Sequence, residues 1–205
     1  PIRRLRCLKG CEPVSIVIEN LSKSFDGKSV LRSFCAEIPD NAVTCLMGES
    51  GCGKTTLLYL LAGLIKPDSG TVVGIPDKNA KIAFVFQENR LVENVTVYRN
   101  LRLVEKVARS DLGDMLEEVG MERALLNKPV SSLSGGMKRR VAILRAMLCD
   151  SAFVFLDEPT SGLDEDNKKL VAAYIRQKCK GKTVLWVTHD RAEAESVADK
   201  RIELD

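Results

Sequence analysis

One stretch of nine residues restricts the possible folds of this chain more than any other part of it. Residues 48–56 read Gly-Glu-Ser-Gly-Cys-Gly-Lys-Thr-Thr and match the phosphate-binding pattern G-x-x-x-x-G-K-S/T. An apolar run over 42–47 precedes this loop, and leucines recur at helical spacing from Leu57 to Leu64 after it. A buried strand, a glycine loop and a helix in this order predict an α/β fold.

The chemistry of the loop predicts a site for a nucleoside triphosphate. Glycines let consecutive backbone N–H groups turn inward around phosphate oxygens, and a helix starting at Lys54 adds the positive end of its dipole. Lys54 would reach the β and γ phosphates, and the Thr55 hydroxyl would ligate Mg²⁺. A chance glycine-rich turn is the alternative, and the strand and helix on either side count against it. The predicted nucleotide-binding residues of the loop are Gly48, Ser50, Gly51, Cys52, Gly53, Lys54, Thr55 and Thr56.

Composition limits the class of protein. The chain of 205 residues can hold one core, or one core with a small subdomain. Its longest apolar run, 57–65, is far below the roughly 20 residues that cross a bilayer. The net charge of +3 comes from mixed signs, so we expect no nucleic-acid partner. The basic residues Arg3, Arg4, Arg6 and Lys9 indicate either a solvated terminus or a contact with an anionic membrane or partner.

The ends of the chain and its cysteines add weaker expectations. A start at Pro1 without Met suggests processing or trimming, with no signal peptide, and the end soon after Ile202 suggests no appended regulatory domain. Seven cysteines, an odd number found largely in apolar runs, favour reduced thiols in a cytosolic protein. The one close pair, Cys7 and Cys11, has no second pair or histidine cluster to complete a zinc site.

The chain before the phosphate loop predicts a small antiparallel region. Val14 to Leu21 alternates apolar and polar residues, Asp26-Gly27 marks a turn, and a second strand is expected over 31–39. Phe25 stands at the end of the first strand in a polar stretch. Its ring either packs under the hairpin or stacks on an adenine base.

After the loop helix the pattern predicts two strands and then a helical segment. Strands are expected over 71–73 and 81–86, and Gln87 follows the second one at the edge where α/β sheets bind ligands. Gln87 is either a solvated loop residue or a sensor that reaches towards Mg²⁺ and the γ-phosphate. From Val95 to about Leu126 apolar residues recur at helical spacing, Val104 among them, which favours a small inserted helical subdomain.

A second candidate anion site lies at the start of a later helix. Ser134, Gly135 and Gly136 combine a hydroxyl, unencumbered backbone N–H groups and a helix dipole. A plain helix cap would explain the serine, but it would hardly explain two consecutive glycines, each of which loses much conformational freedom on folding.

Two further strands end in polar residues. Asp157 and Glu158 close an apolar strand that begins near Ala152, where Asp157 suits a water-bridged Mg²⁺ contact and Glu158 could polarise an attacking water. A helix is expected to run to Cys179. The last core strand is expected over 183–187, and the single histidine, His189, stands at its end.

Taken in this order, the motifs resemble the nucleotide-binding subunit of an ATP-binding-cassette (ABC) transporter over nearly the whole chain. The segment most specific to that family is the signature, Leu133 to Met137, whereas the phosphate loop alone occurs in many families. The other matching positions are an aromatic at Phe25, Walker A at 48–56, the Q-loop residue Gln87, Walker B ending at Asp157 with Glu158 next, the D-loop 161–164 ending in Asp164, and the switch His189.

The resemblance implies a single ABC ATPase domain over 1–205. It has a P-loop NTPase core, an N-terminal antiparallel β region and a helical subdomain inserted at about 88–132. It also implies that two subunits pack head to tail, so that Ser134, Gly135 and Gly136 of one cover the γ-phosphate of ATP held by Lys54 of the other. Asp164 of the D-loop belongs to the implied nucleotide-binding set.

The resemblance further implies how such a dimer works. ATP closes it and hydrolysis reopens it, with Glu158 as general base and His189 positioning the γ-phosphate and water. Lys54 and Gln87 complete the implied catalytic set, and the implied ligands of Mg²⁺ are Thr55, Gln87 and Asp157. Two positions depart from the family pattern: Met137 stands where Gln is usual, and Phe25 stands where Tyr is common.

The implied partners are a second, identical cassette, transmembrane permease subunits contacted through Gln87 and the helical segment, and an extracytoplasmic solute-binding protein. The implied location is the cytoplasmic face of a membrane. The short link from Gly74 to Lys81 and the run 86–91 are most similar to importers of the nitrate, sulfonate and taurine group, with exporters and lipoprotein-release ATPases of similar length as the alternatives. The alternatives are a soluble ABC-type ATPase that acts on nucleic acid or protein complexes, and a regulatory nucleotide-binding module without turnover.

Overall fold

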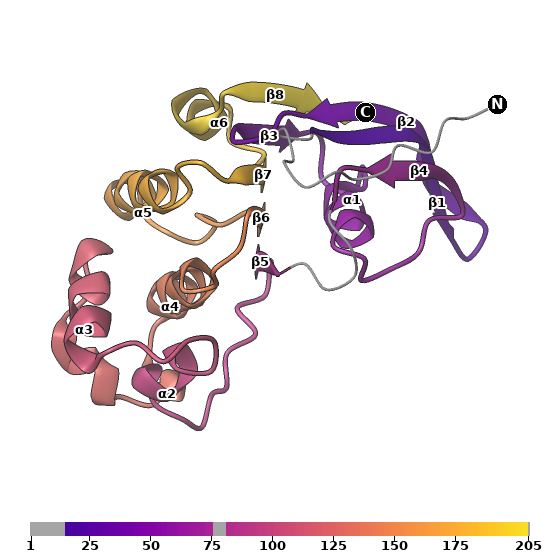
Figure 1. Ribbon diagram of the computed structural model, residues 1–205. Helices are drawn as coiled ribbons and strands as arrows, with labels where there is room; N and C mark the ends of the chain where they lie inside the picture. Colours follow the sequence, from indigo (N-terminus) through magenta and orange to yellow (C-terminus); the bar gives the residue numbers. More distant parts are fainter. Residues whose placement is uncertain (1–14, 76–80, 205) are drawn as a thin grey trace, which may run out of the picture.

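The computed structural model describes residues 15–75 and 81–204 (Figure 1). The basic residues Arg3, Arg4, Arg6 and Lys9, and the pair Cys7 and Cys11, lie outside the described residues. Within them, no helix is both long enough and apolar enough to cross a membrane. The cysteines at 35, 45, 52, 149 and 179 are free thiols.

The strands of the described chain form two sheets. An antiparallel sheet has the order β2-β1-β4, and a parallel sheet has the order β5-β6-β7-β3-β8. The strands of the first are β1 (Ile16–Phe25), β2 (Lys28–Ile38) and β4 (Ser69–Val73). The strands of the second are β3 (Val43–Met47), β5 (Ile82–Val85), β6 (Phe153–Asp157), β7 (Thr183–Val187) and β8 (Lys200–Glu203).

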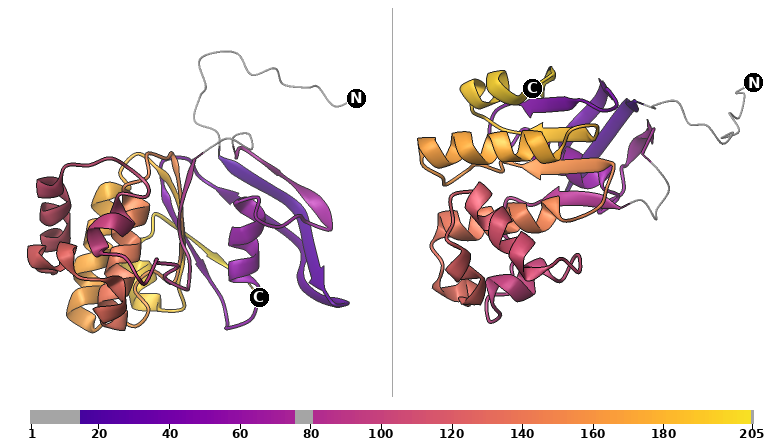
Figure 2. Two further views of the ribbon diagram at one scale, coloured as in Figure 1. Left: turned by 90° about the horizontal axis from the view of Figure 1, so that it is seen from below. Right: turned by 60° about the vertical axis from the view of Figure 1, so that its left-hand side comes forward.

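The helices cover the parallel sheet on both faces. They are α1 (Lys54–Leu61), α2 (Val97–Leu101), α3 (Arg109–Glu118), α4 (Gly135–Met147), α5 (Glu165–Lys178) and α6 (Arg191–Val197). Helix α1 lies between the two sheets, α4, α5 and α6 lie on the opposite face, and α2 and α3 pack against α4 on the side away from α1 (Figure 2). Two short 3-10 helices, η1 (Arg123–Asn127) and η2 (Val130–Ser132), connect α3 to α4.

Successive side chains of the parallel strands point to opposite faces of the sheet, and this divides the hydrophobic core into two halves. Phe155 and Leu185 pack against α1 and the antiparallel sheet, whereas Val154 and Trp186 pack against the helices of the other face. Successive side chains of a strand point to opposite faces, so strands that are apolar at every position can bury both. The sheet thereby separates the helix that follows the phosphate loop from α4 and α5.

The structure corrects the expected end of the core. The strand over 183–187 is not the last one, because α6 and β8 follow, and β8 pairs in parallel with β3 through Thr44↔Lys200 and Leu46↔Ile202. Three of the four side chains of β8 are charged, so its sequence carries little strand signal.

The expected helical stripe over 95–126 is also partly wrong. Helix α2 ends at Leu101, and Val104, with 42% of its surface exposed, lies in the irregular segment before α3. Val97 and Leu101 are fully buried, as expected. The helical spacing of Val104 therefore did not correspond to a continuous helix.

The packing of α1 generates a stability prediction. Leu58 is fully buried between the sheets, so Leu58→Ala should lower the free energy of unfolding by about 2–5 kcal/mol through lost apolar contacts and a residual cavity. Leu103, which is 64% exposed, is the control, and Leu103→Ala should change that energy by less than about 0.5 kcal/mol. Urea unfolding of both variants measures the two values, and equal losses would contradict this packing.

Candidate functional site

The phosphate loop connects β3 to α1 through glycines that no other residue could replace without rearrangement. Gly53 caps α1 with φ 109°, and a Cβ there would lie 2.9 Å from Val30 Cγ1 of β2. A Cβ on Gly48 would lie 2.3 Å from the carbonyl oxygen of Leu204. Both the conformation of Gly53 and the close approach to Leu204 therefore require glycine, and they fix the loop between β2 and the end of the chain's last strand.

Lys54 lies inside the loop rather than in solvent. Its side chain is 7% exposed, and its ammonium donates hydrogen bonds to the carbonyl oxygens of Gly48 at 2.8 Å and Glu49 at 2.6 Å. The amide groups of the first turn of α1 have no carbonyl partners within the helix. A buried cation and a set of free amides at one helix start form an anion-binding site of the kind that holds phosphates.

Thr55 and Asp157 place two oxygen ligands beside that cation. The Thr55 hydroxyl donates to Asp157 Oδ2 at 2.8 Å, across from α1 to the end of β6. Asp157 is 1% exposed, and burial raises the pKa of its carboxyl, an effect that the hydrogen bond from Thr55 opposes. The described residues contain no cluster of three or more His, Cys, Asp and Glu side chains that could hold a metal ion by themselves. The pair fits Mg²⁺, which takes few protein ligands when phosphate oxygens complete its coordination.

Glu158 and His189 meet at the ends of neighbouring strands. Glu158 Oε1 lies 3.0 Å from His189 Nδ1, and the Glu158 amide donates to the carbonyl of Val187 at 3.0 Å. Glu158 has φ 46°, a left-handed conformation that is strained for a residue with a side chain. The His189 side chain remains 68% exposed. A carboxylate and an imidazole in contact can accept and orient protons at this edge of the sheet.

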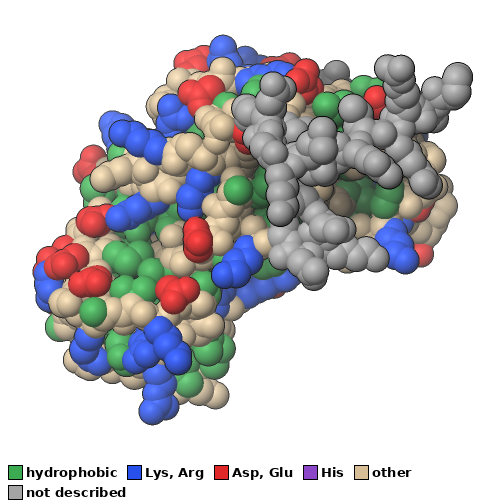
Figure 3. Space-filling model, in the orientation of Figure 1, with side chains coloured by type: hydrophobic (Ala, Val, Ile, Leu, Met, Phe, Trp, Pro, Cys, Tyr) green, Lys and Arg blue, Asp and Glu red, His purple; other side chains and the backbone are tan. Residues whose placement is uncertain are grey.

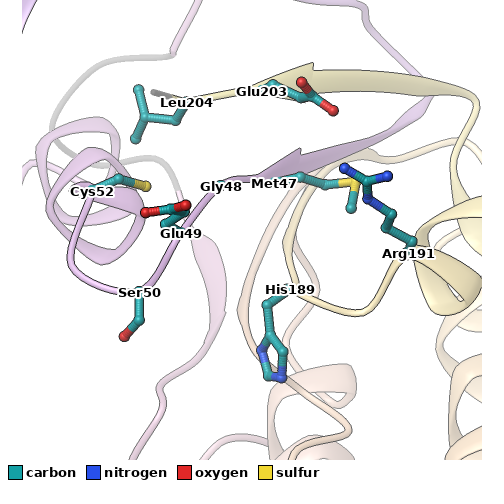
Figure 4. A pocket seen from close by; sticks show the side chains of 9 residues that line it. All are labelled: Met47, Gly48, Glu49, Ser50, Cys52, His189, Arg191, Glu203 and Leu204. Atoms are coloured by element: carbon teal, nitrogen blue, oxygen red, sulfur yellow. The ribbon is translucent and has the colours of Figure 1, made fainter.

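A cavity of about 740 Å³ opens between the loop and His189 (Figure 4). Residues of the loop form one side, and His189 and Arg191 form the other, while Glu203 and Leu204 lie at the end of β8. The sequence analysis missed α6 and β8, and therefore it missed Arg191 and Glu203 as lining residues.

Two residues that support the site were not recognised from the sequence. Glu193 of α6 accepts hydrogen bonds from Thr160, which follows β6, and from Thr188, which precedes His189. Arg139 of α4 is 4% exposed and donates to the backbone carbonyls of Asp157 and Glu158. The available signals were an acid in the first turn of a helix and an arginine among apolar helical residues, and both patterns are common outside functional sites.

Gln87 and Phe25 lie at the periphery. Gln87 follows β5, the neighbour of β6, and its side chain is exposed, with its backbone carbonyl bound by Arg139 at 3.1 Å. Phe25 ends β1 with 45% of its surface exposed and Lys23 Nζ 5.4 Å from its ring centroid. The expectation that Phe25 packs under the hairpin is wrong, and the exposed ring leaves stacking on a base as the remaining prediction.

The structure does not bring the second anion site to the phosphate loop. Ser134 caps α4, its hydroxyl accepting from the amide of Met137 at 3.3 Å, and Gly135 has open space where a Cβ would lie. Asp164 caps α5 and accepts from the amide of Asn167 at 2.9 Å, which lowers the pKa of Asp164. Helices α4 and α5 cover the sheet face opposite α1, and Ser134 and Asp164 face solvent. These residues are available to another molecule.

Comparison with known proteins gives relatives along most of the chain. The spermidine/putrescine import ATP-binding protein PotA of Fusobacterium nucleatum is 34% identical over 205 residues, covering 92% of this chain and 54% of PotA. The chain therefore spans about half the length of that relative. The ergothioneine transport ATP-binding protein EgtV of Helicobacter pylori is 33% identical, with 92% of this chain and 96% of EgtV covered.

A solved structure confirms the predicted ABC ATPase fold. The post-hydrolysis dimer of the ATP-binding cassette MJ0796, bound to ADP and Pi, superposes with a TM-score of 0.80 at 26% identity, covering 93% of this chain and 94% of that one. The family model described as "ABC transporter" matches residues 31–161, from β2 through the phosphate loop to the turn after Glu158. This match covers more than half of the chain, which therefore belongs to the ABC transporter family.

Proposed function

We propose that this chain is the ATP-binding and ATP-hydrolysing subunit of an ABC transporter. The observation that carries the proposal is the chain of contacts at one sheet edge, where Lys54, the Thr55–Asp157 pair and the Glu158–His189 pair line up behind the phosphate loop. The bound ADP and Pi of the related cassette MJ0796 support a nucleotide at this place. The alternative of a soluble ATPase acting on nucleic acid draws no support from the relatives named above. On the face in Figure 3, basic and acidic side chains are interspersed.

Each residue at the edge has a role that its surroundings support. Lys54 would exchange its loop carbonyls for β and γ phosphate oxygens, together with the amides that open α1. Glu158 would take the proton of the attacking water, and His189, in contact with it, would orient the γ-phosphate. Thr55, Asp157 and Gln87 would hold Mg²⁺, whose charge neutralises the phosphates. The remaining loop residues and the ring of Phe25 would bind the nucleotide.

A head-to-tail dimer would complete the site. Ser134, Gly135 and Gly136 start a helix on the face opposite α1, which supports contact with the nucleotide of another subunit and not with that of their own. The hydroxyl of Ser134 and the amides of the glycines provide anion ligands at the positive end of α4, a helix of 13 residues. The solved MJ0796 cassette is itself a dimer, which supports this assembly. Asp164 would lie at the same interface.

A groove between the core and the helical segment would receive the membrane subunit. It measures about 410 Å³ and lies between the end of α1, β5 and α4, with Leu64, 54% exposed, and Val104, 42% exposed, at its rim. Phe84 and Phe86 stack at 4.1 Å between their ring centroids on its wall. Such a surface fits an apolar helix of a permease subunit. Residues 88–132 would then form the subdomain that transmits closure of the dimer.

The printed names of the relatives support a transport system but not one solute. PotA is named for spermidine and putrescine, which are cations, and EgtV is named for ergothioneine. The nitrate, sulfonate and taurine group stays a prediction from 86–91. An extracytoplasmic solute-binding protein would select the solute, and the chain itself would work at the cytoplasmic face of the membrane.

The first test concerns Glu158 and Ser134. Glu158→Gln should lower ATP turnover by about 10²- to 10⁴-fold, because it removes the general base, and should trap an ATP-bound dimer. Light scattering with and without Mg-ATP measures the shift from monomer to dimer. The shift should disappear when Ser134→Arg is added, since a bulky side chain would block the second anion site. ATP binding without any dimer would contradict the homodimer.

The second test concerns Mg²⁺. Asp157→Asn should raise the Mg²⁺ concentration for half-maximal ATP turnover by about 10- to 100-fold, because it removes a charged ligand beside Thr55. The matched control is Asp150→Asn, the same change at an exposed position ahead of β6, which should leave that concentration unchanged. A Mg²⁺ titration of hydrolysis separates the two. Unchanged Mg²⁺ dependence in Asp157→Asn would remove Asp157 from the metal site.

The third test concerns the groove. Leu64→Glu places a charge on the apolar rim and should reduce several-fold the fraction of the chain that stays with its permease subunits on washed membranes. Val73→Glu adds the same charge at a residue of β4 that is 57% exposed and lies outside both the groove and the helical segment, and its retention should match that of the unchanged protein. Retention that is equal for both variants would place the permease contact elsewhere. Turnover of the isolated chain should be unaffected in both.

A further inference from the structure

One arginine of α4 connects the two halves of the proposed site. Arg139 lies in the second turn of the helix that Ser134 caps, and its side chain is 4% exposed. Its guanidinium donates hydrogen bonds to backbone carbonyls at the ends of two neighbouring strands, β5 and β6, and just beyond them. The acceptors are the carbonyls of Phe86, of Gln87 at 3.1 Å, of Asp157 at 2.7 Å, of Glu158 at 2.6 Å and of Pro159 at 2.9 Å.

Burying this cation is costly, and the cost is offset chiefly by these carbonyls, with one further hydrogen bond to the side-chain oxygen Oδ1 of Asn89 at 3.4 Å. No ion pair joins Arg139 to a carboxylate in the described part of the chain. Burial lowers the pKa of Arg139 to about 10, so the guanidinium keeps its charge at neutral pH. A guanidinium has five N–H donors in a rigid plane, and here they face backbone oxygens on two sides. These contacts indicate that Arg139 holds the backbone in place, and they do not indicate that it neutralises a charged side chain.

The carbonyls that Arg139 binds lie in and beside the turn after β6, where Glu158 has a strained backbone conformation. The β6 ladder ends at Asp157, so the carbonyls of Glu158 and Pro159 have no strand partner. Glu158 has φ 46°, and a residue in that conformation persists only where its surroundings hold it. Arg139 supplies hydrogen bonds on both sides of this turn, and the Glu158 amide is held by Val187.

The neighbouring arginines of α4 reach other segments. Arg140 donates to the carbonyls of Val119 and Gly120 after α3, and Arg145 donates to those of Asn89 and Arg90. Among the three, Arg139 alone contacts the end of β6.

We propose that Arg139 is a positioning residue that holds Glu158 and Gln87 in register with the helix start at Ser134. This rests on the proposed function, in which Ser134 contacts the nucleotide of the partner subunit. Movement of Ser134 on dimer closure would be passed through one rigid side chain to the base and the Q-loop of the same subunit. Nucleotide binding to Lys54 and the loop does not involve Arg139 and is independent of it.

Histidine NMR of the full chain tests the positioning without catalysis. His189 is the single histidine, so its ring signals are identified without overlap, and they are sensitive to the contact with Glu158. At fixed pH, Arg139→Met should move these signals towards those of Glu158→Gln. Arg139→Lys keeps the charge with fewer donors and should restore part of the shift. The control is Val141→Ala, a loss of buried volume on the same helix, which should leave the signals unchanged.

Kinetics provide the second readout. Arg139→Met should lower kcat by about 10- to 100-fold, while KM and the affinity for a fluorescent ATP analogue change by less than about threefold. His189 signals in Arg139→Met that match those of the unchanged protein, or a kcat loss no larger than that of Val141→Ala, would overturn the proposal. If the unchanged protein neither binds nor hydrolyses ATP, the proposed function fails instead, and the NMR comparison still decides whether Arg139 positions Glu158.

Discussion

The arrangement of the site depends on the parallel pairing of three strands. Asp157 and Leu46 both lie opposite Val187, one on each side of β7. Because parallel strands end at the same edge, this register brings the phosphate loop, the Asp157–Glu158 pair and His189 to one level. A shift of β6 by one residue would separate Thr55 from Asp157 and Glu158 from His189, and it would also exchange the two faces towards which the side chains of β6 point.

The same sheet also separates the two candidate anion sites. Alternating side chains bury α1 on one face and α4 with α5 on the other, so the starts of α1 and α4 do not meet within one chain, which is consistent with the proposed head-to-tail dimer. Arg139 extends from α4, the helix that Ser134 caps, to the ends of β5 and β6, where Gln87 and Glu158 lie. In the proposed dimer, this buried side chain would link the helix start that meets the partner's nucleotide to Gln87 and Glu158 of its own subunit.

Much of this could be predicted from the sequence because the strongest signals are local. Glycines with a lysine and a threonine, and an apolar strand that ends in two acids, determine their structure within a few residues. Strand β8 could not be predicted in this way, because one apolar residue among four gives no alternating pattern. The strand forms because it pairs with β3. Val104 gave a false helical signal, since spacing does not reveal where a helix ends. Arg139 could not be recognised either, because its partners are backbone atoms 18 to 53 residues away.

The residues at the strand ends are poor choices for stability alone. Asp157 is buried with a raised pKa, Glu158 is strained, and Arg139 is a buried cation without a carboxylate partner in the described chain. Each of these features costs folding free energy, and the apolar packing on both faces of the sheet offsets them. Such costs gather at this one edge, next to Lys54 and the cavity. Such a concentration of costs is expected where chemistry, and not packing, determines the residue type, and it supports the proposal that Arg139 positions residues of the candidate site.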